Sequence, residues 1–86
     1  MEILFTEQFE QAYNRLARDK KESIQKALSL LSVNPRYPSL HVKKLEGKGS
    51  IREARPSKRL RMTFEMTGNT ITMRNVGEHD RVLRKP

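Results

Sequence analysis

The sequence predicts an α+β fold in which an N-terminal helical hairpin packs on one face of a small, mostly antiparallel, twisted sheet. Apolar residues recur every three or four positions between residues 9 and 31, which is the period of a helix. After Asn34-Pro35 and Pro38 the period changes to two, between residues 59 and 66, which is typical of a half-buried strand. Gly68-Asn69 is a two-residue turn of the kind that joins antiparallel strands. The length of 86 residues predicts a single domain, 1–86.

The N-terminal part of the chain predicts one strand and two helices. Residues 2–5 form a short apolar stretch, which we interpret as a strand, and Thr6 after it is a good helix N-cap. A first helix is expected to run to about Arg18. A second one carries an apolar stripe that continues to Leu31. The charged residues 19–22 predict the link between the two helices.

The C-terminal part predicts the sheet. A strand is expected over residues 51–55, a hairpin around Gly68-Asn69, and a final short strand at residues 82–83. The turn pairs Met66 with Ile71 and Phe64 with Met73 on the face that the helices cover. The opposite face is expected to be exposed and basic, and it holds Arg61, Thr63, Glu65, Thr72 and Arg74.

The charge of the chain is strongly basic and unevenly placed. Eighteen Lys and Arg residues against ten Asp and Glu give +8. Residues 1–40 hold six basic and five acidic residues, or +1, and residues 41–86 hold twelve and five, or +7. This excess predicts a nucleic-acid surface, although an acidic protein partner would satisfy the same field.

Several classes of protein are excluded by what the sequence lacks. Without cysteine there is no disulfide framework and no thiolate nucleophile, and two histidines make a weak metal set, so we expect neither a metal site nor a cofactor. The N-terminus has neither a signal-peptide pattern nor an apolar stretch that could span a membrane, so we expect a cytoplasmic protein without a membrane partner.

The expected exposed face carries more arginines than carboxylates. Glu65 with Arg74 or Arg61 is explained most simply as a cross-strand ion pair. The remaining guanidinium groups could hold phosphates bidentately. The basic residues that outnumber Glu53 and Glu65 there are Arg52, Arg55, Lys58, Arg59, Arg61 and Arg74.

Two histidines are candidates for proton transfer near neutral pH. His79 follows Val76-Gly77-Glu78 at the expected end of a strand, where the glycine would let its side chain project over the sheet. His41 is a weaker candidate, and we interpret it as structural. Since RNA carries its own nucleophile, the 2′-hydroxyl, cleavage of RNA without a metal remains feasible for such a set of residues.

Four short segments follow one another along the chain: Lys44-Leu45-Glu46-Gly47, Ile51-Arg52-Glu53-Ala54-Arg55, Leu60-Arg61-Met62-Thr63-Phe64 and Asn75-Val76-Gly77-Glu78-His79-Asp80. In this order they resemble the RelE/ParE superfamily of bacterial toxins from type II toxin–antitoxin systems. The resemblance covers nearly the whole chain and implies a RelE-like fold. For the RelE, YoeB and YafQ branches it implies cleavage of mRNA in the ribosomal A site.

The resemblance also implies roles for single residues. Arg61 matches a transition-state arginine, His79 matches the late residue that protonates the leaving group, and Arg52 matches a basic residue near the scissile phosphate. The wider surface expected to bind RNA consists of Lys43, Lys44, Arg55, Lys58, Arg59, Arg74 and His41. The implied partners are an antitoxin protein, the ribosome with its rRNA, and mRNA.

The sequence leaves the class of toxin open. One alternative is a ParE-like toxin that inhibits DNA gyrase and cuts nothing, and retention of Arg61 and His79 favours the nuclease over it. Phe64 stands where the family pattern has tyrosine, and Asp80 stands where some members have an aromatic residue. A third alternative is therefore an inactive protein that still binds an antitoxin.

Overall fold

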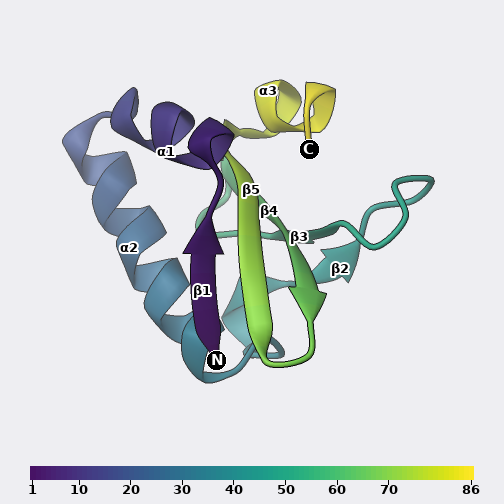
Figure 1. The fold of residues 1–86 in the computed structure, drawn as a ribbon. Helices are drawn as coiled ribbons and strands as arrows, with labels where there is room; N and C mark the ends of the chain where they lie inside the picture. Colours follow the sequence, from purple (N-terminus) through teal and green to yellow (C-terminus); the bar gives the residue numbers. More distant parts are fainter.

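The structure is a computed structural model that describes all 86 residues (Figure 1). Its strands are β1 (Glu2–Phe5), β2 (Lys43–Lys44), β3 (Arg52–Ala54), β4 (Leu60–Thr67) and β5 (Thr70–Glu78). Its helices are α1 (Glu7–Asn14), α2 (Arg18–Val33) and α3 (His79–Arg84), with a short 3-10 turn, η1 (Pro38–Leu40). The predicted α+β class is confirmed.

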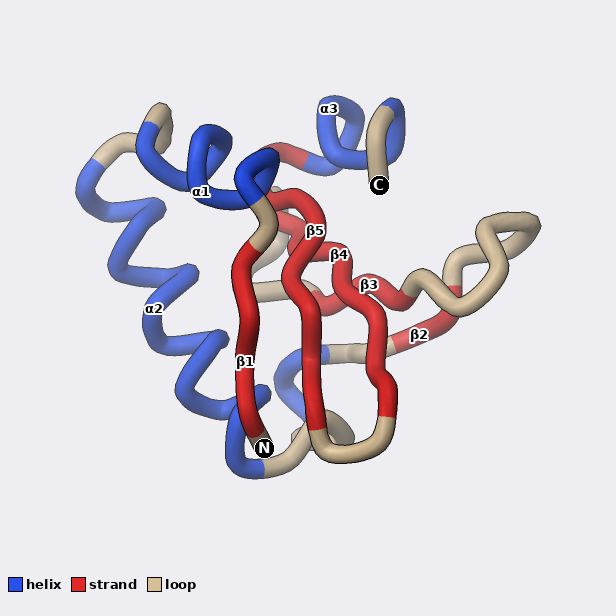
Figure 2. Tube along the Cα trace, viewed as in Figure 1, coloured by secondary structure: helices blue, strands red, loops and turns tan.

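The five strands form one sheet in the order β1-β5-β4-β3-β2 (Figure 2). β1 runs parallel to β5, and all other neighbours are antiparallel. Met66 lies opposite Ile71 and Phe64 opposite Met73, as predicted. Strand β2, which was not predicted, has only two residues and extends the sheet beyond β3.

Helices α1 and α2 cover one face of the sheet and bury the main core. Thr6 caps α1 as predicted, since its Oγ1 accepts a hydrogen bond from the Phe9 amide at 3.1 Å. None of the helices has the length and apolar character that a membrane span requires. The core residues are Phe9, Ile24, Ala27, Leu31, Leu40, Ala54, Leu60, Met62, Phe64, Ile71, Met73 and Val76.

The predicted link between the two helices is wrong. Residues 19–22 lie inside α2, and only Arg15, Leu16 and Ala17 separate α1 from α2. Charged side chains suit this first turn of α2, because Asp19 lies near the positive end of the helix dipole and Arg18 meets Glu22 four residues later.

The second face of the sheet, turned away from α1 and α2, is called the open face here. Met62, Phe64 and Ile71 are buried on the core face, and side chains alternate between the two faces along a strand. Their position and the strand register therefore identify the residues of β2 to β5 on the open face. They are Lys43, Glu53, Arg61, Thr63, Glu65, Thr67, Thr70, Thr72, Arg74, Asn75 and Gly77.

A β-bulge interrupts the pairing of β4 and β5. Phe64 lies opposite Met73 and Thr63 opposite Asn75, so Arg74 is the extra residue. The bulge lets two consecutive side chains, Arg74 and Asn75, both reach the open face. Strict alternation, on which the sequence prediction relied, would have placed Asn75 on the core face.

The predicted final strand at residues 82–83 is wrong, because these residues belong to α3. Val82 is fully buried, and a Cβ on Gly77 would lie 3.6 Å from its Cγ2, so α3 packs on the open face at this glycine. Asp80 in the first turn and Arg81 and Arg84 in the last turn match the helix dipole. One end of the open face is therefore covered rather than exposed.

The hydroxyl of Thr6 joins α1 to β5, because besides capping the helix it donates to the Arg74 main-chain oxygen at 3.1 Å. We expect Thr6→Ala to lower the free energy of unfolding by about 1 to 2 kcal/mol, since it removes both hydrogen bonds. Urea denaturation measures this loss. Thr6→Ser keeps the hydroxyl and should retain most of the stability; equal losses in the two variants would contradict this explanation.

Candidate functional site

Arg61 is buried, and the expectation of an exposed strand position is wrong. Its side chain is 7% exposed and that of Glu53 on β3 is 4% exposed, with Nε 3.3 Å from Oε1. The register explains why the two meet: Glu53 lies opposite Thr63, and Arg61 lies on the same face of β4 as Thr63. Gly77 lies opposite Arg61 and beside Val82, so α3 packs on the sheet next to this buried pair.

The guanidinium of Arg61 also organises the loop that precedes β4. Its Nη1 donates to the main-chain oxygens of Ser57 at 3.2 Å, Lys58 at 3.0 Å and Leu60 at 2.8 Å. Ser57 and Lys58 precede β4 and Leu60 is its first residue, so these bonds tie the loop to the start of the strand. The catalytic role implied for Arg61 stays a prediction, but the structure gives this residue a positioning role.

Arg52 does not share a face with Arg61. It lies opposite Phe64, whose side chain is in the core, so Arg52 belongs to the helix-covered side of the sheet at its edge. Lys44 lies opposite Arg52, whereas Lys43 lies opposite Glu53 on the open face. Adjacent residues of a strand alternate between faces, so Glu53 lies on the face of Arg61 and Arg52 lies on the other. The prediction that Arg52 and Arg61 hold one phosphate on the same exposed face is therefore wrong.

His79 is the first residue of α3 rather than a side chain projecting from a strand over the sheet. Its amide donates to the Arg59 main-chain oxygen at 3.1 Å, so the loop before β4 and the start of α3 are in contact. The side chain is about half exposed, and its Nδ1 lies 3.1 Å from Oδ1 of Asp80. The Nε2 atom makes no hydrogen bond within the chain.

The neighbouring Glu78 is also held by a basic residue. Lys20 Nζ on α2 lies 2.9 Å from Glu78 Oε1. The hydrogen bond and positive charge of Lys20 hold the pKa of Glu78 below its ordinary value. The last residue of β5 is thereby linked to the first turns of α2, directly beside His79.

His41, Arg55 and Lys58 line a shallow hollow of about 320 Å³ together with Ser39, Pro56 and Ser57. His41 has a left-handed backbone with φ of 48°, which is uncommon for a residue other than glycine. The Arg55 amide donates to the Leu40 main-chain oxygen at 2.7 Å and so ties the two segments together. Lys58 and Arg59 are exposed. The RNA-binding role of these residues stays a prediction.

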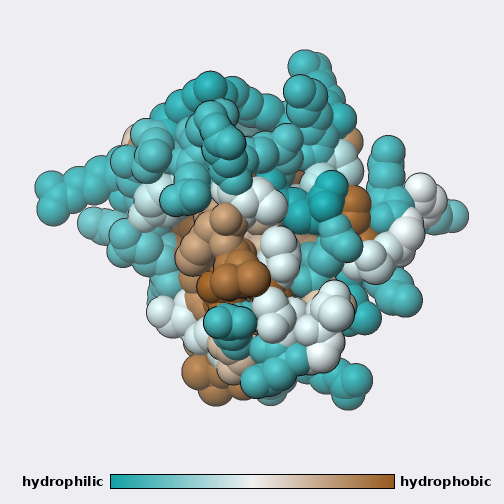
Figure 3. Space-filling model, in the orientation of Figure 1, coloured by the Kyte–Doolittle hydropathy of each residue, from teal (hydrophilic) through white to brown (hydrophobic).

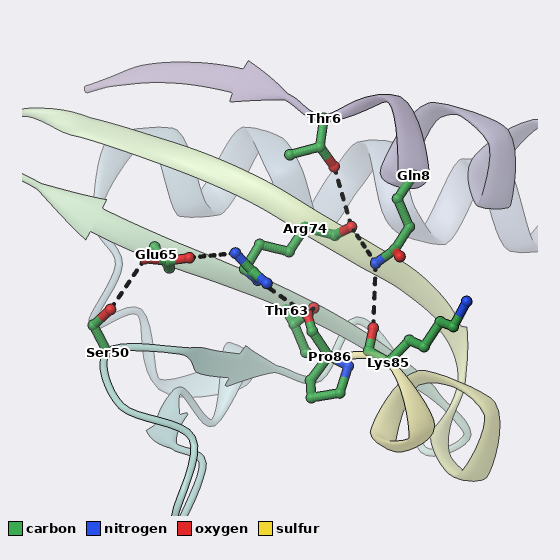
Figure 4. Close-up of polar contacts among 8 residues, drawn as sticks. All are labelled: Thr6, Gln8, Ser50, Thr63, Glu65, Arg74, Lys85 and Pro86. Carbon is green, nitrogen blue, oxygen red and sulfur yellow. Dashed lines mark hydrogen bonds and ion pairs between the residues drawn. The ribbon is translucent and has the colours of Figure 1, made fainter.

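Arg74 lies in the middle of a polar cluster on the open face (Figure 4). The expected cross-strand ion pair is confirmed, since Nη1 of Arg74 contacts Oε1 of Glu65. Ser50 donates to the other oxygen of Glu65 at 3.1 Å. Nε of Arg74 donates to the main-chain oxygen of Pro86 at 3.1 Å.

Residues 85 and 86 occupy this polar cluster with their main-chain oxygens (Figure 4). Thr63 Oγ1 donates to the Pro86 oxygen at 3.1 Å, so this oxygen receives bonds from two strands. Gln8 donates to the Lys85 oxygen at 3.2 Å, and Asn75 Nδ2 donates to the same oxygen at 2.8 Å. Four donors thus converge on two oxygens.

Sequence reasoning missed Gln8, Thr63 and Asn75 as polar groups that converge, because each is an ordinary residue in its own segment. It also missed Arg15, Arg81 and Arg84, which stand in helical segments outside the four matched motifs. The spacing of Arg81 and Arg84, three residues apart, would have indicated one helix face had the segment been recognised as a helix.

The buried contact of Arg61 with Glu53 should dominate the response to mutation at this site. Arg61→Ala leaves Glu53 buried without a countercharge and frees three carbonyls, so we expect a loss of about 3 to 5 kcal/mol in unfolding free energy. Chemical denaturation measures it. The double variant Glu53→Gln/Arg61→Met removes both charges and should recover much of the loss; a double variant as unstable as Arg61→Ala would contradict the proposed cause.

Sequence comparison gives no assignment for this chain. No protein-family model matches it, and no curated protein matches it in sequence.

Comparison of structures finds the same fold in bacterial and archaeal toxins. YafQ from E. coli superposes with a TM-score of 0.80 at 15% identity, covering 94% of this chain and 96% of that one. A YoeB/ParE toxin from Agrobacterium tumefaciens gives 0.78 at 15% identity, covering 92% and 99%. A chain of the RelB–RelE antitoxin–toxin complex from Methanococcus jannaschii gives 0.75 at 20% identity, covering 96% and 99%. Over nearly its whole length, this chain therefore has the fold of the RelE/ParE toxins.

Proposed function

We propose that this chain is the toxin of a type II toxin–antitoxin system and that it cleaves mRNA on the ribosome. The fold of the RelE/ParE toxins supports the first part. The observation that carries the second part is the contact of His79 with Asp80 beside the basic loop before β4. The net charge of +8 agrees with a polyanionic substrate.

In the proposed reaction His79 acts as the general acid. The 2′-oxygen of the RNA attacks the adjacent phosphorus and gives up its proton to water, and the bond from phosphorus to the 5′-oxygen breaks. The protonated Nε2 of His79 donates its proton to the leaving 5′-oxygen. Asp80 accepts a hydrogen bond from Nδ1–H, which fixes the ring and leaves Nε2 as the nitrogen that faces substrate.

The charge that develops on the phosphate needs cations nearby. Arg59 and Lys58 are exposed in the loop whose backbone contacts His79, and Arg61 holds this loop from below. In this proposal Arg59 and Lys58 contact the phosphate, and Arg61 acts by positioning them. This arrangement differs from the one implied by family resemblance, in which Arg61 and Arg52 hold the phosphate directly.

An antitoxin is the proposed protein partner, as in the RelB–RelE and DinJ–YafQ complexes with which this fold is shared. Strand β1 is an edge strand, and Leu4 and Phe5 on it are 48% and 46% exposed. Figure 3 shows hydrophobic surface over β1 within a hydrophilic surrounding. Phe5 and Phe9 with Tyr13 and Leu28 line a hollow of about 350 Å³ beside this strand, suited to apolar side chains of a partner.

The role of His79 predicts a specific defect. His79→Gln should lower cleavage of mRNA on programmed ribosomes by roughly 10² to 10⁴, the usual contribution of a positioned acid, while ribosome binding stays nearly unchanged. Asp80→Asn should lower cleavage less, because the imidazole remains. Primer extension on ribosome-bound message measures the cleavage, and co-sedimentation measures the binding. Arg36→Gln, in the exposed turn after α2, serves as the control.

Three results would count against the proposal. Loss of ribosome binding in His79→Gln would make this residue a phosphate contact rather than an acid. A fully active variant would remove it from the chemistry. Message left intact by the unaltered protein on several codons, together with blocked supercoiling by DNA gyrase, would replace the nuclease with the ParE-like alternative.

A further inference from the structure

Three arginines outside the predicted RNA-binding set gather between α1 and α3. Arg15, Arg81 and Arg84 line two adjoining hollows of about 590 and 530 Å³, which share these three residues and Ala12. Figure 1 shows α1 and α3 at the same end of the strands, and Figure 3 shows a hydrophilic surface over them. All three arginines are exposed.

None of these arginines forms an ion pair. The five ion pairs of the chain are Arg18–Glu22, Lys20–Glu78, Arg61–Glu53, Arg74–Glu65 and His79–Asp80. The hollows do contain carboxylates, but each has another neighbour: Glu7 accepts from Gln11, Glu78 contacts Lys20, and Asp80 contacts His79. Arg15, Arg81 and Arg84 thus have no carboxylate within ion-pair distance. The larger hollow also contains Lys85, so it holds four cations and one carboxylate, Glu7.

The positions of these arginines are set by the fold. Arg81 and Arg84 lie one turn apart on α3, and the buried Val82 between them anchors the helix on the sheet. Arg15 directly follows α1 as its C-cap, and its amide donates to the Ala12 main-chain oxygen at 3.3 Å. Gln8 of α1 donates to the Lys85 oxygen and so ties the end of α3 to α1.

A third hollow extends this basic surface toward the open face. It has a volume of about 350 Å³, contains Arg74 and Lys48, and shares Gln8 and Lys85 with the larger of the two arginine-lined hollows. Arg74 is paired with Glu65, but Lys48 and Lys85 in this hollow extend the series of cations formed by Arg84, Arg81 and Arg15. A continuous series of this kind fits a polymer with a negative charge on every repeat.

We propose that Arg15, Arg81 and Arg84 bind successive phosphates of single-stranded RNA, forming a backbone-binding track that leads away from His79. This inference rests on the proposed RNA substrate and adds a second contact region to it. Guanidinium groups hold phosphates bidentately. Ala12 is the one apolar residue that lines the larger hollow, so the hollow offers little to the apolar side chains of a protein segment.

The salt dependence of RNA binding tests the track. The probe is a 2′-O-methyl RNA dodecamer, which has no 2′-hydroxyl nucleophile and stays uncut. Arg81→Gln/Arg84→Gln should lower the slope of log Kd against log salt by about 1.4, or about 0.7 for each lost phosphate contact, and weaken binding roughly twentyfold at about 100 mM salt. Fluorescence anisotropy across a salt series gives both quantities.

A matched control separates the site from net charge. Arg18→Gln/Arg36→Gln also removes two positive charges, but from exposed positions outside the hollows. It should leave the slope of log Kd against log salt nearly unchanged. Equal changes in the two double variants would overturn the track. Arg15→Gln, outside α3, should lower the slope by about 0.7. This variant keeps the test available if the α3 variant, Arg81→Gln/Arg84→Gln, fails to fold.

Two further arms give distinct outcomes. If the α3 variant keeps its RNA slope but loses binding to a polyglutamate peptide, the surface serves an acidic protein and the proposal is overturned. Cleavage of ribosome-bound mRNA is measured separately. If the unaltered protein cuts no message but the two double variants differ in salt slope, the track is supported and the nuclease proposal fails. If the unaltered protein cuts message but the two double variants have equal slopes, the track is overturned and the nuclease proposal stands.

Discussion

The buried contact between Arg61 and Glu53 is the constraint on which the functional end of the sheet depends. It joins β3 to β4, and the same guanidinium holds the main-chain oxygens of Ser57, Lys58 and Leu60. The oxygen of Arg59 in that loop then receives the amide of His79, where α3 begins. Separating these two buried charges would leave each without its countercharge, which is costly, so this end of the molecule has little freedom to rearrange.

The position of α3 follows from this loop and determines what the open face can bind. Gly77 has no side chain between β5 and Val82, and the extended positive φ of 151° at this residue is one that glycine adopts readily. The helix therefore lies directly on the sheet, with His79 at its start and Arg81 and Arg84 in its last turn. One short helix thus links the proposed acid to the proposed RNA track, which places chemistry and binding on the same rigid element.

Much of the fold could be predicted because its signals are local. β1 and the pairing of Met66 with Ile71 follow from an apolar run and a two-residue turn. The face of Arg52, the burial of Arg61 and the contact of the His79 amide with Arg59 could not be predicted in the same way, because each depends on a partner distant in sequence. The bulge at Arg74 reverses the alternation after it, and the six residues of α3 are too few to show a helical period.

The capture of Lys85 and Pro86 by Gln8, Thr63, Arg74 and Asn75 has a consequence for competition. These donors already hold main-chain oxygens that the chain keeps beside them, at an effective concentration on the order of millimolar or more. A small free anion would have to displace these oxygens first, so it would gain only the difference between its charge-assisted hydrogen bonds and the neutral ones that it replaces. A polymer with several phosphates would displace Lys85 and Pro86 once and then gain contacts through its other phosphates. The contact of Lys85 and Pro86 with these donors therefore favours multivalent anions over small ones of the same charge density.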